Sequence, residues 1–158
     1  MLAVFDIDGV VADVRHRLHH LRRANRWTQF FQGAGDDPLL AEGAALVADL
    51  AREHEIVWLT GRPDWLRATT AGWLSEHGLP GTELHMRRDG DYRPARAFKL
   101  GVLRRLDPRG IAAFVDDDRE VVDAALSAGF PAALADWVSR DDQDADVLHD
   151  AQERYGRT

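Results

Sequence analysis

Hydrophobic residues in this chain come in short runs that longer amphipathic segments separate. Five of the runs are typical of β-strands, being short and rich in β-branched or aromatic residues. They lie at Leu2–Phe5, Glu55–Leu59, Glu83–Met86, Ile111–Val115 and Pro131–Leu134. Strands that alternate with helices predict an α/β fold. We therefore expect a three-layer, Rossmann-like, mostly parallel sheet with helices on both faces.

The segments between these runs carry helix signals. Residues 39–53 place Leu46, Val47 and Leu50 at helical spacing. Pro63 is expected to open a second helix, in the first-turn position where proline is tolerated. That helix should stop at Gly78. Two more helices are expected over residues 94–106 and 118–128.

Length and composition narrow the class of protein. A chain of 158 residues with 45% hydrophobic and 30% charged residues predicts one folded domain, residues 1–158. No apolar run approaches about 18 residues, so no membrane span is expected. The start of the chain resembles no signal peptide, and we expect a cytoplasmic protein. With no cysteine, disulfides, thiolate metal sites and cysteine nucleophiles are excluded. The oligomeric state stays open.

The net charge of -7 argues against a general nucleic-acid coat protein. Arginines nevertheless gather locally between residues 15 and 26, in a segment that also contains three histidines, Trp27 and Phe31. Such a segment could neutralise backbone phosphates and stack a base. It could equally pack its aromatic residues on the sheet and turn its arginines to water.

Two acids follow the first strand directly, in the stretch AVFDIDGVVAD. Asp6 and Asp8 are two residues apart, so both could lie on one side of the strand's C-terminal end. Like charges held close together repel, and a bound cation is the usual remedy. The alternative is a simple turn at Asp8 and Gly9 that closes the strand.

Polar residues also follow two later strands. Thr60, Gly61 and Arg62 come after the second strand, and this combination suits an oxyanion. Three acids, residues 116–118, come after the fourth strand, and Lys99 lies in the preceding helical segment. Because ligands of parallel sheets bind beyond the C-terminal strand ends, these groups should meet at one edge.

The stretches DIDGV, LTGRP and FVDDD, together with Lys99, occur in the order of the four motifs of the haloacid dehalogenase (HAD) superfamily of phosphotransferases. The chain resembles this superfamily from Asp6 to Asp117. Within it, LTGRP and VDDDREVV are most similar to the phosphatase domains of polynucleotide kinases.

The resemblance implies a role for each matched residue. Asp6 would be the nucleophile, and Asp8 the general acid and then the general base. Asp6 and the backbone carbonyl of Asp8 would bind Mg²⁺. Asp117, supported by Asp116, would complete the protein's share of the metal ligands. Independently of the resemblance, Asp118 is expected to cap the helix that it precedes. Thr60, Lys99 and Arg62 would hold the phosphoryl oxygens. Substrate contacts are expected from Gly9, Gly61, Arg17, Arg22 and Arg23.

Many members of the superfamily carry a cap domain, for which this chain has no room. Residues 14–36 are too few for a separate domain and would form a short flap beside an open site. The expected activity is Mg²⁺-dependent hydrolysis of a phosphomonoester on a nucleic-acid 3′ end or a nucleotide. The alternatives are a general phosphatase for small metabolites and a catalytically silent binding module.

Overall fold

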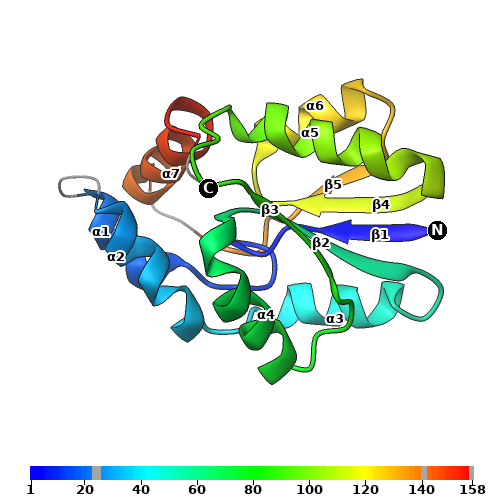
Figure 1. Ribbon diagram of the computed structural model, residues 1–158, viewed down its shortest axis with the longest axis horizontal. Coiled ribbons are helices and arrows are strands. Elements are labelled where there is room, and N and C mark those ends of the chain that lie inside the picture. The colour runs from blue at the N-terminus through cyan, green and yellow to red at the C-terminus, as the bar shows by residue number, and fades with distance from the viewer. Residues whose placement is uncertain (23–25, 140–141, 157–158) are drawn as a thin grey trace.

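A five-stranded sheet forms the centre of the computed structural model, which describes residues 1–22, 26–139 and 142–156 (Figure 1). The strands run β3-β2-β1-β4-β5 across the sheet, and all the neighbouring pairs are parallel. They are β1 (Leu2–Phe5), β2 (Glu55–Pro63), β3 (Glu83–Arg87), β4 (Ile111–Asp116) and β5 (Ala132–Leu134). The predicted α/β class is therefore confirmed.

Two pairs of helices cover the two faces of the sheet (Figure 1). One pair is α5 (Ala95–Leu106) and α6 (Arg119–Ser127), and the other is α3 (Ala41–Leu50) and α4 (Arg67–Glu76). Alternate residues of β1 serve the two sides, because side chains alternate along a strand. Leu2 and Val4 join the α5–α6 core, whereas Ala3 and Phe5 join the α3–α4 core.

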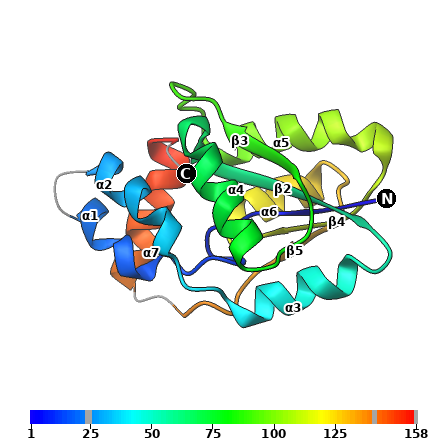
Figure 2. The same ribbon diagram turned by 60° about the horizontal axis from the view of Figure 1, so that its bottom comes forward.

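A third group of helices lies beyond the C-terminal ends of the strands (Figures 1 and 2). It contains the 3-10 helices η1 (Arg15–Arg17) and η2 (Gly33–Asp36), the helices α1 (His19–Arg22), α2 (Trp27–Gln32) and α7 (Asp142–His149), and the π-helix η5 (Asp150–Arg154). Leu18, Phe30 and Phe31 are buried in the core of this group with Leu148. The segment expected to be a flap thus packs its aromatic residues inward.

The β2 strand extends further than the sequence predicts. It continues through Thr60 to Pro63, and its register with β3 is irregular between those two residues. The following helix therefore begins after Pro63, as the 3-10 helix η3 (Asp64–Leu66) that leads into α4. Another 3-10 helix, η4 (Asp107–Arg109), ends α5. This extension carries Arg62 past the end of β1.

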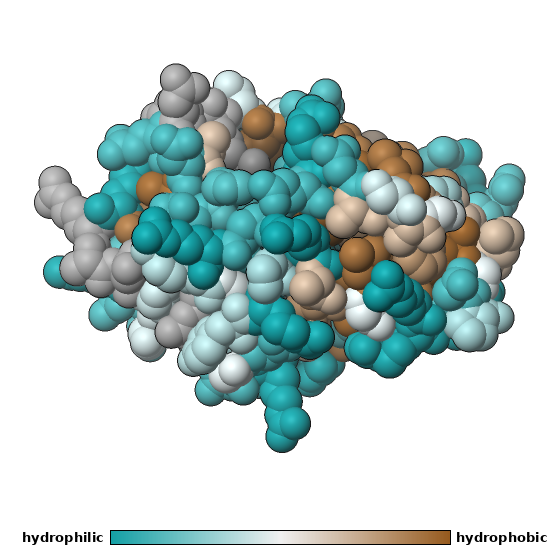
Figure 3. Space-filling model, turned by 90° about the horizontal axis from the view of Figure 1, so that it is seen from above, coloured by the Kyte–Doolittle hydropathy of each residue, from teal (hydrophilic) through white to brown (hydrophobic). Residues whose placement is uncertain are grey.

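The outer helix α3 touches the turn that follows β1. A Cβ atom placed at Gly43 would lie 1.8 Å from the carbonyl oxygen of Val10, so only glycine allows this approach. Among the described residues, no helix is long and apolar enough to cross a membrane. The face that α5, α6 and α7 form is mostly hydrophilic towards α7, and hydrophobic side chains gather over the α5–α6 end (Figure 3).

Candidate active site

Asp6 is the first acid beyond β1, and its backbone continues the ladder by donating to the carbonyl of Val115 at 2.9 Å. Its Oδ1 atom accepts a hydrogen bond from the Ile7 amide at 2.7 Å. Its Oδ2 atom accepts one from Lys99 Nζ, also at 2.7 Å. The carboxylate is therefore fixed at the C-terminal end of β1 by a backbone amide and a lysine.

Lys99 of α5 is buried and bridges two acids. Its Nζ atom donates to Asp116 Oδ2 at 2.7 Å, the same distance as to Asp6. Burial alone would lower the pKa of Lys99, but Asp116 and Asp6 raise it above its usual value. The ammonium group therefore stays charged at the C-terminal ends of β1 and β4.

Asp6, Asp116 and Asp117 form a cluster that could hold a metal ion. Each offers a carboxylate oxygen, and these oxygens lie within 4.8 Å of one another. Burial raises the pKa of Asp6 to about 6 despite Lys99, and it raises the pKa of Asp116 well above its usual value. Hard oxygen donors and acids that crowd in a buried place fit Mg²⁺.

The third acid of the run serves a different purpose, as the sequence predicts. Asp118 is the N-cap residue of α6, and its side chain accepts from the Glu120 amide at 2.9 Å. Its own amide donates to Asp116 Oδ1 at 3.0 Å. The cap fixes the direction in which the chain leaves the acids of β4.

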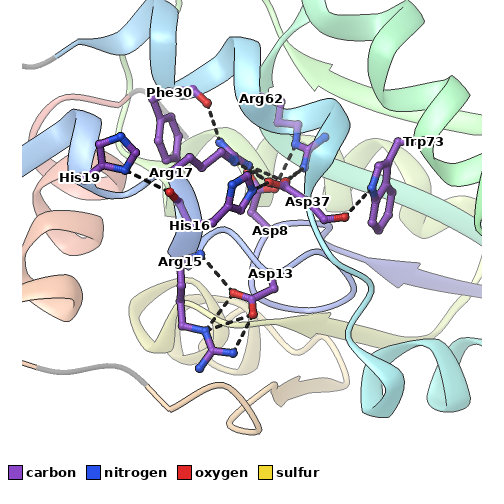
Figure 4. A network of polar contacts seen from close by, with 10 residues as sticks. All are labelled: Asp8, Asp13, Arg15, His16, Arg17, His19, Phe30, Asp37, Arg62 and Trp73. Atoms are coloured by element: carbon purple, nitrogen blue, oxygen red, sulfur yellow. Dashed lines mark hydrogen bonds and ion pairs between the residues drawn. The ribbon is translucent and has the colours of Figure 1, made fainter.

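Asp8 lies in surroundings of opposite charge (Figure 4). Its Oδ1 atom accepts from Arg62 Nη2 at 2.6 Å and Nε at 2.9 Å, and from Arg17 Nη2 at 3.1 Å. Burial alone would raise the pKa of Asp8, but the two guanidinium groups lower it to about 2. Among the described residues, its buried Oδ2 atom has no hydrogen-bond partner.

Asp37 joins the two arginines, a role that no pattern in the sequence indicated. Its carboxylate accepts from Arg17 at 2.8 and 2.9 Å and from Arg62 at 2.8 Å (Figure 4). His16 Nε2 lies 2.7 Å from Asp37 Oδ1. The backbone carbonyl of Asp37 accepts from Trp73 Nε1 at 2.8 Å. In the sequence, nothing distinguishes this buried residue from its exposed neighbour Asp36.

The two described arginines that were expected to meet the substrate, Arg17 and Arg22, both pair with acids of the protein. The Arg17 side chain is only 1% exposed, and its guanidinium lies 4.2 Å from the centre of the Phe30 ring. Arg22 pairs with Asp144 of α7, with Nε at 3.0 Å from Oδ1. Arg23 lies outside the described residues. The burial of Arg17 argues against it as a contact for a polymer backbone, whereas Arg22 is paired but stays exposed.

The small residues of the motifs have local roles as well. Thr60 lies within β2, and its Oγ1 atom accepts from the Arg62 amide at 3.2 Å. Gly9 adopts a φ of 74° and donates its amide to the carbonyl of Ala12 at 2.9 Å. That bond closes the turn carrying Asp8. Gly61 lies in the irregular part of β2 and is buried.

A family model for the polynucleotide kinase PNKP phosphatase domain matches residues 1–133 of the chain. No curated protein matches it. Among solved structures, one chain of the Pnkp1/Rnl/Hen1 complex is similar with a TM-score of 0.69 and 20% identity, covering 85% of this chain and 44% of that one. A chain of the Pnkp1/Rnl/Hen1 RNA repair complex gives 0.68 and 22%, covering 84% and 42%.

A hydrolase of the haloacid dehalogenase-like family from Streptococcus pneumoniae is similar over more of its own length. Its TM-score is 0.59 at 12% identity, and the match covers 94% of this chain and 91% of that one. By contrast, this chain spans less than half of the two chains from the Pnkp1/Rnl/Hen1 structures. At these identities the likeness shows the fold alone.

Proposed function

Because the chain belongs to the polynucleotide kinase PNKP phosphatase domain family and is a phosphatase of haloacid dehalogenase type, we propose that it hydrolyses phosphomonoesters through a phosphoryl group carried on Asp6. The observation that carries this mechanism is the placement of Asp6. Its carboxylate lies 2.7 Å from the Lys99 ammonium and within the acid cluster of Asp116 and Asp117.

In the first half of the reaction, an Asp6 oxygen attacks phosphorus and the ester oxygen leaves with a proton from Asp8. Lys99 and Thr60 hold the phosphoryl oxygens, whose charge has to be neutralised. In the second half, Asp8 takes a proton from water, which attacks the same phosphorus. Phosphate is released, and Asp6 returns to its original state.

Asp6, Asp116 and Asp117, with the Asp8 carbonyl, would hold Mg²⁺. When bound, the ion neutralises charge on the transferring group. Lys99 keeps its charge through its contacts with Asp6 and Asp116, which suits a group that attracts a phosphate dianion to this edge.

One oxygen of Asp8 is held by the arginines, and the other is buried without a hydrogen-bond partner among the described residues. The contacts of Arg62 and Arg17 are on Oδ1, so Oδ2 is the atom suited to exchange a proton with the substrate or water. A pKa of about 2 keeps Asp8 ionised in the resting protein, which suits the base of the second half. An arriving phosphate dianion opposes this charge and favours protonation for the first half.

Arg62 positions Asp8 in this mechanism. It donates to Asp8 and Asp37 with a fully buried side chain, so its guanidinium holds the acid in place. This assignment replaces the expectation that Arg62 grips the phosphate itself.

The substrate class proposed from the family is a nucleic-acid 3′ end or a nucleotide. A second class, small phosphorylated metabolites, is favoured by one observation. The Arg17 side chain is buried and paired within the protein, which removes one cation from the surface that a polymer was expected to use.

Initial rates on a substrate panel test these proposals. The panel contains 3′- and 5′-phosphorylated oligonucleotides, nucleotides and sugar phosphates, each measured with Mg²⁺ and with EDTA. We expect EDTA to abolish turnover and Mg²⁺ to restore it. Asp8→Asn should lower kcat by roughly 10²- to 10⁴-fold, the usual value of general acid–base help. Wild-type turnover by Asp8→Asn, or full activity in EDTA, would contradict the mechanism.

A further inference from the structure

A cavity of about 420 Å³ opens at the end of β2, and several aromatic residues line it. Residues lining it include Trp27, Phe31, Trp65, Tyr92, Arg87 and Arg88. Its volume falls in the range of sites that hold small organic ligands, which are largely apolar with a few polar groups. None of the proposed catalytic residues lines this cavity.

The cavity lies at the C-terminal end of β2. Pro63, the last residue of β2, lines it and follows Arg62, which binds Asp8. Pro63 pairs with Arg87 in the β2–β3 ladder, and Arg87 also lines the cavity. Trp65 comes three residues after Arg62, a span of at most about 11 Å of chain. The cavity therefore lies at the same end of the sheet as Asp8 and the arginine that holds it.

Two of the aromatic residues that line the cavity are largely exposed to solvent. Trp65 is 50% exposed and Tyr92 is 55% exposed, and both line the same cavity. Single exposed hydrophobic residues are common on protein surfaces, but a gathering of aromatic side chains around one hollow marks a binding site.

Trp65 is held by a packed aromatic chain beneath it. Its ring meets the buried Phe31 ring edge to face, with centroids 6.1 Å apart. Phe31 in turn stacks with Trp27 at 6.4 Å. A ring supported in this way presents contact area without losing much side-chain freedom on binding.

The loop carrying Tyr92 is fixed as well. Arg87 Nη1 donates to the carbonyls of Asp91 and Arg93 at 3.3 and 2.7 Å, one on each side of Tyr92. The Asp89 amide donates to Asp64 Oδ1 at 3.1 Å, which links this loop to the residue before Trp65. The two exposed aromatics thus belong to one connected wall.

We propose that this cavity binds the nucleobase of the phosphorylated substrate, with Trp65 and Tyr92 providing the stacking surface. The inference rests on the proposed phosphatase function, since the phosphate would lie at Asp6 while its base enters the cavity. A planar heteroaromatic ring fits these walls because bases of any sequence stack on aromatic side chains. Recognition then comes from the base, and the buried arginines near Asp8 need not contact a polymer.

The test compares substrates with and without a base. KM and kcat are measured for a nucleoside 3′-monophosphate, for an oligonucleotide with a 3′-phosphate, and for deoxyribose 3-phosphate, which has no base. Stacking of one base is worth roughly 5- to 150-fold in affinity. Trp65→Ala should reduce the kcat/KM preference for the nucleotide over deoxyribose 3-phosphate by about that factor, mainly through KM.

Two further variants serve as controls. Trp65→Phe should recover most of the preference, because a ring remains. Leu126→Ala changes a residue of α6 that is 51% exposed and does not line the cavity, and it should leave the preference unchanged. If Trp65→Ala and Tyr92→Ala both keep the full preference, or if the wild type shows none, the base does not use this cavity.

The source of the base is read from the same data. An equal change for the nucleotide and the oligonucleotide assigns the cavity to the phosphorylated residue's own base. A change for the oligonucleotide alone assigns it to a neighbouring base of a nucleic acid.

Equilibrium binding of adenosine, which has no phosphate, separates this proposal from the catalytic one. It is followed by isothermal titration calorimetry, which needs no turnover and does not depend on the tryptophan that the variant removes. Binding by the wild type that Trp65→Ala weakens supports the cavity even if no ester is hydrolysed. Hydrolysis of deoxyribose 3-phosphate without adenosine binding or a base preference leaves the phosphatase intact and overturns the base site.

Discussion

Asp6 and Asp8 are separated by one residue, yet the protein treats them in opposite ways. Asp6 lies among acids and shares one lysine with Asp116, and its pKa rises to about 6. Asp8 has two arginines on one oxygen, and its pKa falls to about 2. Neighbouring carboxyl groups whose surroundings separate their pKa values are suited to different chemical roles. The Asp6 side is electrostatically unsatisfied without a metal, whereas the Asp8 side is neutralised by the protein itself.

The largest effect we expect is on turnover. Asp6→Asn should reduce hydrolysis of every substrate below detection, because an amide is a poor nucleophile, while the fold survives. Phosphate release under saturating Mg²⁺ measures the rate, and circular dichroism checks the fold. Turnover near the wild-type rate would contradict the covalent mechanism and the assignment of different roles to Asp6 and Asp8.

The next largest effect concerns the stability of the Asp8 side. Arg17→Ala should lower the free energy of unfolding by about 3–5 kcal/mol, because Asp37 and Asp8 lose a buried charged partner. Arg22→Ala is the matched control: its partly exposed pair with Asp144 should be worth about 0–1 kcal/mol. Urea unfolding measures both, and similar losses for the two variants would mean that burial of the Asp8 network contributes little.

When no metal is present, removing the charge of Asp6 should raise the free energy of unfolding rather than lower it. A carboxyl group with a raised folded pKa stabilises the protein while protonated, and this contribution is lost as the pH rises from about 4 through about 6. In urea unfolding at pH 7.5 with EDTA, the free energy of unfolding of Asp6→Asn should therefore exceed that of the wild type by at most about 3 kcal/mol. At pH 4 the gain should disappear.

Added Mg²⁺ provides the control for that experiment. Binding to the folded state should stabilise the wild type and leave Asp6→Asn nearly unchanged. If Asp6→Asn is no more stable than the wild type in EDTA at pH 7.5, the charges of the acid cluster do not destabilise the metal-free protein.

The smallest effects separate the acids of the β4 end. Asp118→Ala removes a helix cap and should cost about 1 kcal/mol without changing the Mg²⁺ requirement. Asp117→Ala should raise the Mg²⁺ concentration needed for half-maximal activity. Metal titrations and urea unfolding of both variants decide between the two roles. Equal shifts in the Mg²⁺ requirement would mean that the ligand is misplaced within the run.

Local patterns in the sequence predicted much of this arrangement. The strand at Leu2–Phe5 has the predicted bounds, and Asp118 caps α6 as expected. Both depend on residues close together in the chain, where propensity and spacing act. The extension of β2 to Pro63 was not predicted, because Gly61 and Pro63 are turn residues in isolation and the pairing with β3 overrides them.

Local sequence patterns could not predict the partners of Asp8. Arg17 and Asp37 meet across 20 positions of chain that include the short helices α1 and α2, and Arg62 joins them from β2. The sequence therefore showed that arginines were present without showing that they face inward. The cavity beside Trp65 was missed for the same reason, since its walls come from four segments.

The close approach of Gly43 to Val10 bears on how this protein can be engineered. Replacing glycine by alanine within a helix is a common route to heat resistance, and Gly72 of α4 suits that change, because an added methyl group there would meet no atom within 4 Å. At Gly43 the same change would push on the turn holding Asp8. A designer who ranks helix glycines by propensity alone would treat both alike and lose activity at a position 35 residues from the acid it disturbs.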